Sequence, residues 1–187
     1  MSEIVVNTAV YSLPPNGVIG AAQGLSWFAV QTRPRHEKKV NADLREKGIH
    51  SFLPLQREKR RWSDRQQWVE LPLFTHYVFV RIPTSTESRV RVLETIGVVK
   101  FAGVAGCGTP IPDGQIQNLY AIVERRVPVV TQQFLRAGER VRIRGGALNG
   151  IEGLLVAIQN EKTLVVSVDL IQKSVAIRID GFDVEPA

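Results

Sequence analysis

The sequence has little cysteine and lacks a long apolar run. Its single cysteine, Cys107, excludes a disulfide within the chain and gives no basis for a cysteine-based metal site. No apolar run approaches the roughly 20 residues that a membrane-spanning helix needs, and residues 1–25 lack the basic start and continuous apolar core of a signal peptide. We therefore expect a cytoplasmic protein with no membrane contact.

The patterns of common catalytic sites are also missing. The glycine-rich stretch 145–150 lacks the Gly-Lys-Ser/Thr ending of a phosphate-binding loop. His36, His50 and His76 are too scattered to bind one metal ion from a helix, and no serine or cysteine has the setting of a nucleophile. The sequence predicts a protein that is not an enzyme and has no cofactor and no metal.

Positive charge, by contrast, is abundant and local. The chain has 24 Lys and Arg against 18 Asp and Glu; residues 33–65 hold eleven and five of these, which accounts for the whole net charge of +6. The basic block runs into an apolar, aromatic stretch at residues 71–82. Such a combination favours a protein that meets a polyanion and an apolar protein groove together.

Apolar periodicity and turn residues divide the chain into several parts. Residues 1–25 mix Pro, Gly and small residues and are predicted to be a loose extension. Strands and helices alternate in mixed order over residues 26–126, which indicates an α+β sandwich on an antiparallel sheet. Residues 127–134 are expected to be a linker, and residues 135–187 have five short strands, typical of a small closed β-barrel.

Local patterns predict the elements of the first domain. They are a strand at 27–31, a helix from Pro34 to a cap at Gly48, a hairpin with arms 57–62 and 67–71 and a basic tip at 63–65, a strand at 73–82, a helix capped by Thr84 with Glu87, a strand at 98–102, and a helix from Pro112 or Asp113. Alternation along the strand at 73–82 puts Tyr77 and Phe79 on one face and Phe74 on the other. One face is then expected to fill the core while aromatic groups remain for a partner.

Three motifs carry a resemblance to a known family. The segments W-F-A-V-Q at Trp27, L-F-T-H-Y-V-F-V at Leu73 and G-E-R-V-R-I-R-G-G-A-L-N-G-I-E-G-L-L at Gly138 resemble, in order and spacing, the NusG family of transcription elongation factors. The resemblance covers residues 26–187. It implies a NusG-type N-terminal domain and a C-terminal SH3-like KOW β-barrel with a glycine at the position of Gly153. One departure is Thr75-His76, where the family usually has Pro-Gly or Pro-Asn.

The stretch F-L-P-L-Q-R-E-K-R-R-W-S-D-R-Q-Q-W-V-E-L-P-L-F at residues 52–74 is further similar to specialised paralogs of the UpxY and RfaH type. Those paralogs are antiterminators that act on long polysaccharide-type operons. The resemblance therefore implies an antitermination factor for specific operons. A housekeeping NusG-type general elongation factor and a ribosome-associated RNA-binding KOW protein remain as alternatives.

The resemblance also implies roles for individual residues. Contacts to the clamp helices of RNA polymerase fall on Phe74, Tyr77, Phe79, Ile116 and Leu119; contacts to the opposite pincer on Ser88 and Arg89; contacts to the non-template DNA strand on Arg33, His36 and Lys39; and contacts to a small-subunit ribosomal protein or to Rho on Leu148, Ile151 and Ile171. Arg65, in the basic hairpin tip, is a further candidate for DNA contact. No His-Thr-Thr motif is present at Ser88. We expect a monomer.

Each candidate also has a purely structural interpretation. The aromatic strand and the apolar residues of the barrel are the kind that fill cores, and a basic helix face is often only solvated. Trp62 and Trp68 flank the hairpin tip, where they are suited either to stack on a base or to pack against each other across the strands.

Overall fold

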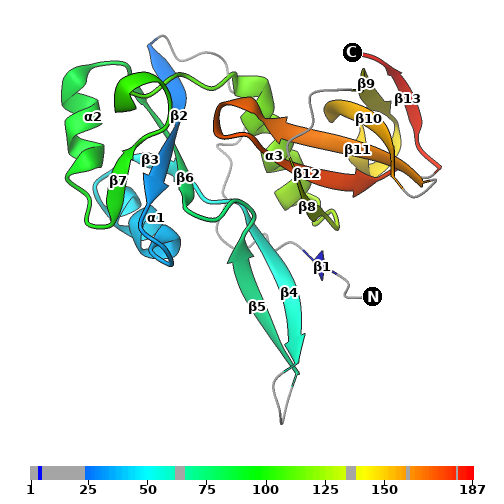
Figure 1. The fold of residues 1–187 in the computed structure, drawn as a ribbon, viewed down its shortest axis with the longest axis horizontal. Helices are drawn as coiled ribbons and strands as arrows, with labels where there is room; N and C mark the ends of the chain where they lie inside the picture. Colours follow the sequence, from blue (N-terminus) through cyan, green and yellow to red (C-terminus); the bar gives the residue numbers. More distant parts are fainter. Residues whose placement is uncertain (1–3, 6–23, 62–65, 134–137, 159–160, 180) are drawn as a thin grey trace. The chain divides into compact units, whose positions relative to one another are not determined.

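The computed structural model describes residues 4–5, 24–61, 66–133, 138–158, 161–179 and 181–187 (Figure 1). The chain forms two compact units. The first unit comprises residues 10–53 and 74–113, and the second comprises residues 1–9, 54–73 and 114–187.

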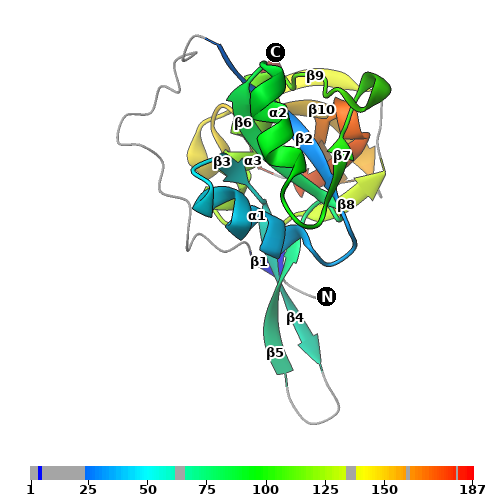
Figure 2. The same cartoon turned by 90° about the vertical axis from the view of Figure 1, so that its left-hand side faces the viewer.

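The first unit is a four-stranded antiparallel sheet with two helices. Its strands run in the order β3 (His50–Phe52), β6 (Tyr77–Pro83), β2 (Leu25–Thr32) and β7 (Val98–Phe101). Helices α1 (Glu37–Glu46) and α2 (Thr86–Leu93) lie over one face of this sheet (Figure 2). The α+β class with an antiparallel sheet, predicted from the sequence, is confirmed for this unit.

Continuous apolar runs form the two central strands of this sheet. In β2 the residues 27–30, and in β6 the residues 78–80, are at most 1% exposed, so both faces of each strand are buried. Helix α1 adds Val40 and Leu44, which lie one turn apart and are fully buried. Gly48 follows that helix with φ 72°, as a C-terminal cap requires.

The strand predicted from Leu73 starts four residues later, at Tyr77. Residues 73–76 form a turn instead, in which the Tyr77 N–H donates to the Phe74 carbonyl (3.3 Å) and His76 has φ 70°. The predicted alternation of faces is therefore wrong before Tyr77. His76 takes the left-handed conformation that Gly and Asn adopt most readily, and these are the residues that the resemblance gives for this position.

Helix α2 has its cap one residue later than predicted. The cap is Ser85, not Thr84: Ser85 has extended backbone (φ −68°, ψ 150°) and its Oγ accepts a hydrogen bond from the Ser88 N–H (3.3 Å). Two adjacent hydroxyl residues offer the same capping chemistry, and the backbone conformation selects the second of them.

A hairpin belongs to the second unit. Strands β4 (Leu55–Arg61) and β5 (Gln66–Pro72) pair antiparallel, which confirms the predicted hairpin. Strand β1 (Ile4–Val5), within the extension predicted at 1–25, pairs with β4. The rest of that extension, apart from Gly24 and Leu25, and the predicted tip with Trp62 and Arg65 lie outside the described residues.

A six-stranded antiparallel sheet follows in the same unit. Its order is β13 (Asp183–Pro186), β9 (Glu139–Arg144), β10 (Glu152–Ile158), β11 (Glu161–Val168), β12 (Lys173–Arg178) and β8 (Val130–Gln133). Strand β8 lies in the segment predicted as a linker, at residues 127–134. Among the described strands the pairing runs linearly from β13 to β8, so that a closed barrel stays a prediction.

Gly153 marks a close approach of two strands in this sheet. A Cβ atom at this residue would lie 2.5 Å from the Val165 carbonyl oxygen and 3.0 Å from Leu164 Cγ. Real Cβ atoms do not come so near to a backbone oxygen, so strands β10 and β11 require a residue without a side chain here.

Helix α3 (Asp113–Glu124) starts where the sequence predicts. Its buried residues are Ile116, Leu119, Ile122 and Val123, each at most 1% exposed. None of the helices in the described ranges is both long enough and apolar enough to cross a membrane.

Candidate functional site

A basic loop connects β2 to α1 in the first unit. Its backbone is fixed at both ends, because the Arg33 N–H donates to the Gly97 carbonyl (2.8 Å) and the His36 N–H donates to the Arg33 carbonyl (3.1 Å). His36 Nδ1 lies 3.0 Å from the Pro34 carbonyl oxygen. A Cβ atom at Gly97, just before β7, would lie 3.0 Å from Val40 Cγ2 and 3.2 Å from His36 Cβ, so the glycine lets the segment before β7 sit close to the start of α1.

The side chains of this loop point to solvent. Arg33 in this loop and Lys39 in the first turn of α1 are exposed, and His36, the cap of α1, is half-buried, so three of the four predicted DNA contacts lie in the loop and the start of the helix. Arg35, which the sequence analysis did not select, is also exposed and has φ 63°. The fourth predicted contact, Arg65, lies outside the described residues.

Glu37 ties the basic loop to the turn before β6. It occupies the first turn of α1 and is only 6% exposed. Its Oε1 accepts a hydrogen bond from the His76 backbone N–H (2.8 Å) and lies 3.8 Å from His76 Nδ1. The His76 carbonyl in turn accepts from the Thr32 N–H (2.8 Å). The carboxylate therefore fixes the spacing between the loop and the turn.

Sequence reasoning missed Glu37. The available hint was an acidic residue inside a basic block, in the first turn of a predicted helix, where a carboxylate is favoured by the helix dipole. That hint indicates a helix start only. Its partner lies 39 residues away in the sequence.

The three aromatic residues predicted to contact polymerase differ in exposure. Tyr77 is half-buried, whereas Phe74 and Phe79 are at most 1% exposed. The rings of Phe74 and Phe79 meet edge to face with centroids 6.1 Å apart, and Phe79 also packs on Phe52 at 6.2 Å. Tyr77 is therefore the aromatic group available to a partner, and the two phenylalanines belong to the core.

The predicted contacts on α2 are engaged within the unit. The Ser88 hydroxyl accepts from the Ser85 hydroxyl (2.9 Å) at the helix cap. The Arg89 guanidinium carbon lies 5.6 Å from the centre of the Phe28 ring, a cation–π arrangement. Both residues are half-buried.

A second cation lies inside the first unit. Arg81 is 8% exposed, and its Nη2 lies 3.6 Å from Asp113 Oδ2. His50 packs edge-on against Trp27, with ring centroids 5.2 Å apart. Partial desolvation, together with the charges of Arg81 and Arg45, lowers the pKa of His50 below its ordinary value.

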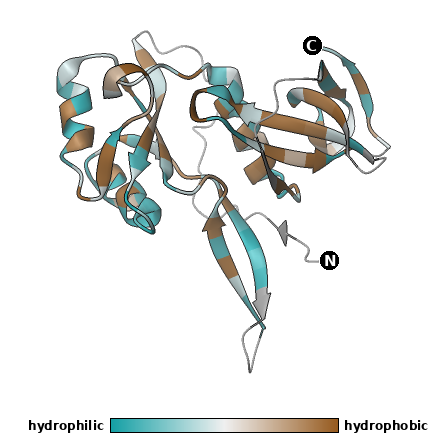
Figure 3. Ribbon diagram, viewed as in Figure 1, coloured by the Kyte–Doolittle hydropathy of each residue, from teal (hydrophilic) through white to brown (hydrophobic). Residues whose placement is uncertain are grey.

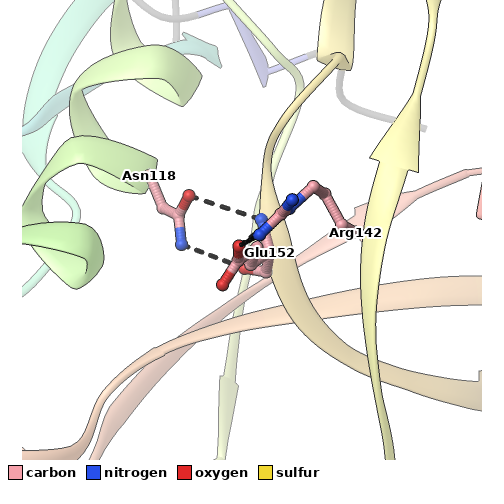
Figure 4. A network of polar contacts seen from close by, with 3 residues as sticks. All are labelled: Asn118, Arg142 and Glu152. Carbon is pink, nitrogen blue, oxygen red and sulfur yellow. Dashed lines mark hydrogen bonds and ion pairs between the residues drawn. The ribbon is translucent and has the colours of Figure 1, made fainter. Parts of the chain in front are cut away.

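In the second unit, helix α3 contacts two turns of the C-terminal sheet through polar side chains. The Asn118 amide donates to the Glu152 carbonyl (3.1 Å) and accepts from the Glu152 N–H (3.3 Å), as Figure 4 shows. The Gln115 amide donates to the Asp169 carboxylate (2.7 Å) and accepts from the Asp169 N–H (3.2 Å). Arg125 donates to the Asn149 carbonyl (3.1 Å).

The Glu152 side chain extends this network. Its Oε1 accepts hydrogen bonds from both Nε (2.8 Å) and Nη2 of Arg142, on the neighbouring strand β9 (Figure 4). The hydrogen bond and the negative charge raise the pKa of Arg142 above its ordinary value. Glu152 thus joins helix α3 to β9 through its backbone on one side and its carboxylate on the other.

The three residues predicted to bind a ribosomal protein or Rho lie at the turns that α3 contacts. Leu148 and Ile151 flank the pair Asn149-Gly150, and Ile171 ends the short helix that starts at Asp169. The three side chains are 5%, 1% and 7% exposed, so they are core residues in this conformation.

A protein-family model matches the first part of the chain. The family model described as transcription termination factor nusG matches residues 25–120, just over half of the chain. This range includes β2, the basic loop, the turn before β6 and most of α3.

Curated relatives match over nearly their whole length. The chain is similar to the transcription termination/antitermination protein NusG of Borreliella burgdorferi, with 24% identity over 86% of this chain and 97% of that protein. It is similar to the protein of the same name from Lactococcus lactis, with 27% identity over 91% and 96%. The Staphylococcus aureus protein is 25% identical over 85% and 94%.

A solved structure shares the fold. The structure described as domain interaction in Thermotoga maritima NusG superposes with a TM-score of 0.52 and 20% identity, covering 88% of this chain and 98% of that one.

Proposed function

Because this chain belongs to the NusG family, we propose that it is a transcription elongation and antitermination factor that binds RNA polymerase and suppresses pausing or termination. The observation that carries the proposal is the contact of Glu37 with His76. It holds the basic loop at a fixed distance from the turn that precedes Tyr77, the partly accessible aromatic residue. This arrangement offers cations for a nucleic acid beside an aromatic anchor for a protein.

Tyr77 is the proposed main anchor on the clamp helices of RNA polymerase. A protein groove gains most of its affinity from a few buried anchors, often about 2 kcal/mol each on truncation. Phe74 and Phe79 are both buried, so they would not touch the partner but would support the turn at residues 73–76 through core packing. Ile116 and Leu119 are fully buried, so they would act by holding α3 in place, and Ser88 with Arg89 would face the opposite pincer.

The basic loop is the proposed contact for the non-template DNA strand. Arg33, His36 and Lys39, together with Arg65 of the hairpin, would neutralise phosphates without reading the sequence. Exposed charges add little affinity, typically below about 1 kcal/mol per pair, so the loop would act mainly on orientation and association rate.

The proposed mechanism requires no chemistry. By binding the clamp helices of the elongating enzyme more tightly than those of the paused enzyme, the factor would shift the population toward elongation. A ligand shifts such an equilibrium only by its differential affinity for the two states. Tyr77 and the basic loop must therefore bind the elongating polymerase more tightly than the paused one.

We also propose the domain boundaries and the role of the C-terminal part. Residues 26–126 would form the NusG N-terminal domain and residues 135–187 an SH3-like KOW barrel, joined by a linker at 127–134. Leu148, Ile151 and Ile171 of that barrel would bind a small-subunit ribosomal protein or Rho. The protein would act as a monomer in the cytoplasm.

Within the family, we propose the specialised type related to UpxY and RfaH factors. The support is the strongly basic hairpin strand β4 and the extension before Leu25. Mapping of the protein on the chromosome by chromatin immunoprecipitation tests this: occupancy confined to a few long operons is expected. Occupancy that follows RNA polymerase on most genes would instead assign a housekeeping role, and co-sedimentation with ribosomes in the absence of transcription would favour the RNA-binding alternative.

Polymerase binding is tested by a matched pair of single substitutions. Tyr77→Ala should weaken the binding of purified RNA polymerase by about tenfold or more, because it removes the accessible anchor. Val104→Ala truncates an apolar residue of the first unit that is 82% exposed and outside the proposed surface, and this variant should bind as the wild type does. Equal affinity of both soluble variants would reject the proposed surface.

A further inference from the structure

The hairpin of the second unit carries an aromatic group opposite a cation. In the register of β4 and β5, Lys59 pairs with Trp68 and Arg57 pairs with Glu70. Residues directly opposite each other, and residues two apart on one strand, point to the same face of a hairpin. Arg57, Lys59 and Trp68 therefore share one face.

These three side chains are exposed in the structure. Trp68 exposes 44% of its surface, the largest aromatic group among the exposed apolar residues of the described chain. Arg57 and Lys59 are exposed as well, whereas Val69 on the opposite face is half-buried. Strand β4 is hydrophilic over most of its length (Figure 3).

The positive charge of this face, together with its aromatic ring, favours a nucleic acid as its partner. Arg57 has a partial counter-ion in Glu70, whose Oε1 lies 3.9 Å from Nε, a long contact between an exposed and a half-buried side chain. Lys59 stands directly across from the indole. A flat aromatic ring flanked by cations fits a nucleobase on the ring and phosphates beside it, which is the composition of sequence-tolerant single-strand binding surfaces. A protein groove would instead favour neighbours that are apolar.

We propose that Trp68, Lys59 and Arg57 form a stacking site for one base of single-stranded DNA. Trp68 supplies the stacking platform, and the two cations bind the flanking phosphates. The proposal rests on the proposed function in that a transcription bubble presents such a strand, but it needs no contact with polymerase. It adds to the basic loop a site that holds a base rather than a phosphate.

The test uses the full chain and fluorescently labelled oligothymidylate in an anisotropy titration. Trp68→Ala should weaken binding by about tenfold, since stacking of one base has an effect of that order. Trp68→Phe keeps a ring and should lose much less. In a plot of log K against the logarithm of the salt concentration, Lys59→Ala should make the slope less steep by about 0.7, the value for one phosphate contact on a single strand. Gln67→Ala, next to Trp68 but on the other face, is the matched control.

An oligonucleotide with abasic sites separates stacking from charge. It keeps every phosphate, so the wild type should bind it about tenfold more weakly than oligothymidylate, while Trp68→Ala should bind both alike. Equal binding of the two strands by the wild type would overturn the proposal, as would an equal loss for duplex DNA with Trp68→Ala. Tighter binding of oligouridylate than of oligothymidylate would overturn the assignment to DNA.

The result is independent of the test of the proposed function. A protein that fails to bind polymerase but distinguishes normal from abasic strands through Trp68 would retain the stacking site and lose the proposed function. A protein that binds polymerase through Tyr77 and treats both strands alike would retain the function and lose the site.

Discussion

The basic loop of the first unit and the turns of the C-terminal sheet are both predicted binding regions, yet they are held in opposite ways. In the loop, backbone N–H groups make hydrogen bonds that fix it, and the side chains of Arg33 in the loop and Lys39 at the start of α1 remain exposed. At the C-terminal turns, side chains of α3 bond to the backbone, and the candidates Leu148 and Ile151 are buried.

This difference implies different costs of binding in the two regions. The loop is fixed through its backbone N–H groups and through the Glu37 carboxylate, so its exposed side chains need no further ordering, which reduces the entropy cost of binding. A turn whose backbone is bonded by another element's side chains must release those contacts before new ones replace them. We therefore expect the two regions to respond differently to substitutions in their supports.

The largest effect is expected from Gly153→Ala, which acts on the second region alone. The new Cβ would meet the Val165 carbonyl oxygen at 2.5 Å, and the strain should destabilise the C-terminal sheet by about 3 kcal/mol. Urea unfolding followed by circular dichroism measures it. Gly114→Ala is the matched control, because a Cβ there meets nothing within 4 Å and φ is not positive. Wild-type stability of Gly153→Ala would mean that β10 and β11 do not approach so closely.

The elements themselves were predictable where a local pattern decides them. Val40 and Leu44 mark α1, Gly48 ends it, and Asp113 starts α3, each through periodicity or capping chemistry within a few residues. The turn at residues 73–76 was not predicted from its own residues, because it lacks Gly and Pro and runs into strand-forming residues; only the Pro-Gly or Pro-Asn that the resemblance gives at Thr75-His76 pointed to a turn.

Features that depend on distant pairing were also missed. Strand β8 contains polar residues beside Pro128 and becomes a strand only by pairing with β12, over 40 residues later. The same applies to the candidate site: exposed Arg33 and Lys39 were identifiable by charge, but the support of Glu37 and the burial of Phe74 are tertiary facts.

A smaller effect is expected for Glu37→Ala, which acts on the first region. It leaves the His76 N–H without its acceptor and should cost about 2 kcal/mol, the order found when a charged hydrogen-bond partner is lost. Glu37→Gln retains an acceptor oxygen and should recover part of this loss. Glu46→Ala, an exposed residue at the end of the same helix, should leave stability unchanged. If the first two variants unfold as the wild type does, the loop and the turn are not held by this carboxylate.

Asn118→Ala should have a weaker and more local effect. It removes both hydrogen bonds to the backbone of Glu152, a partly exposed pair with a net value of about 1 kcal/mol. Hydrogen exchange by NMR should show the Glu152 amide exchanging about fivefold faster, with no change at the His76 amide. Gln117→Ala, exposed on the same helix, is the control. Unchanged exchange at Glu152 would show that α3 does not support this turn.

The smallest expected effect is on the pH dependence of stability, through His50 of the first unit. Desolvation, Arg81 and Arg45 lower the pKa of folded His50, while the unfolded chain keeps the ordinary value of 6.5. As pH falls below 6.5 the unfolded state therefore takes up the proton first, and the stability that His50 contributes at neutral pH is lost down to its folded pKa. His50→Phe keeps a ring against Trp27 but does not titrate, so its unfolding free energy should fall less on acidification than that of the wild type. Parallel pH profiles of the two proteins, measured by urea unfolding, would mean that His50 titrates alike in both states and that acid acts on the carboxylates instead.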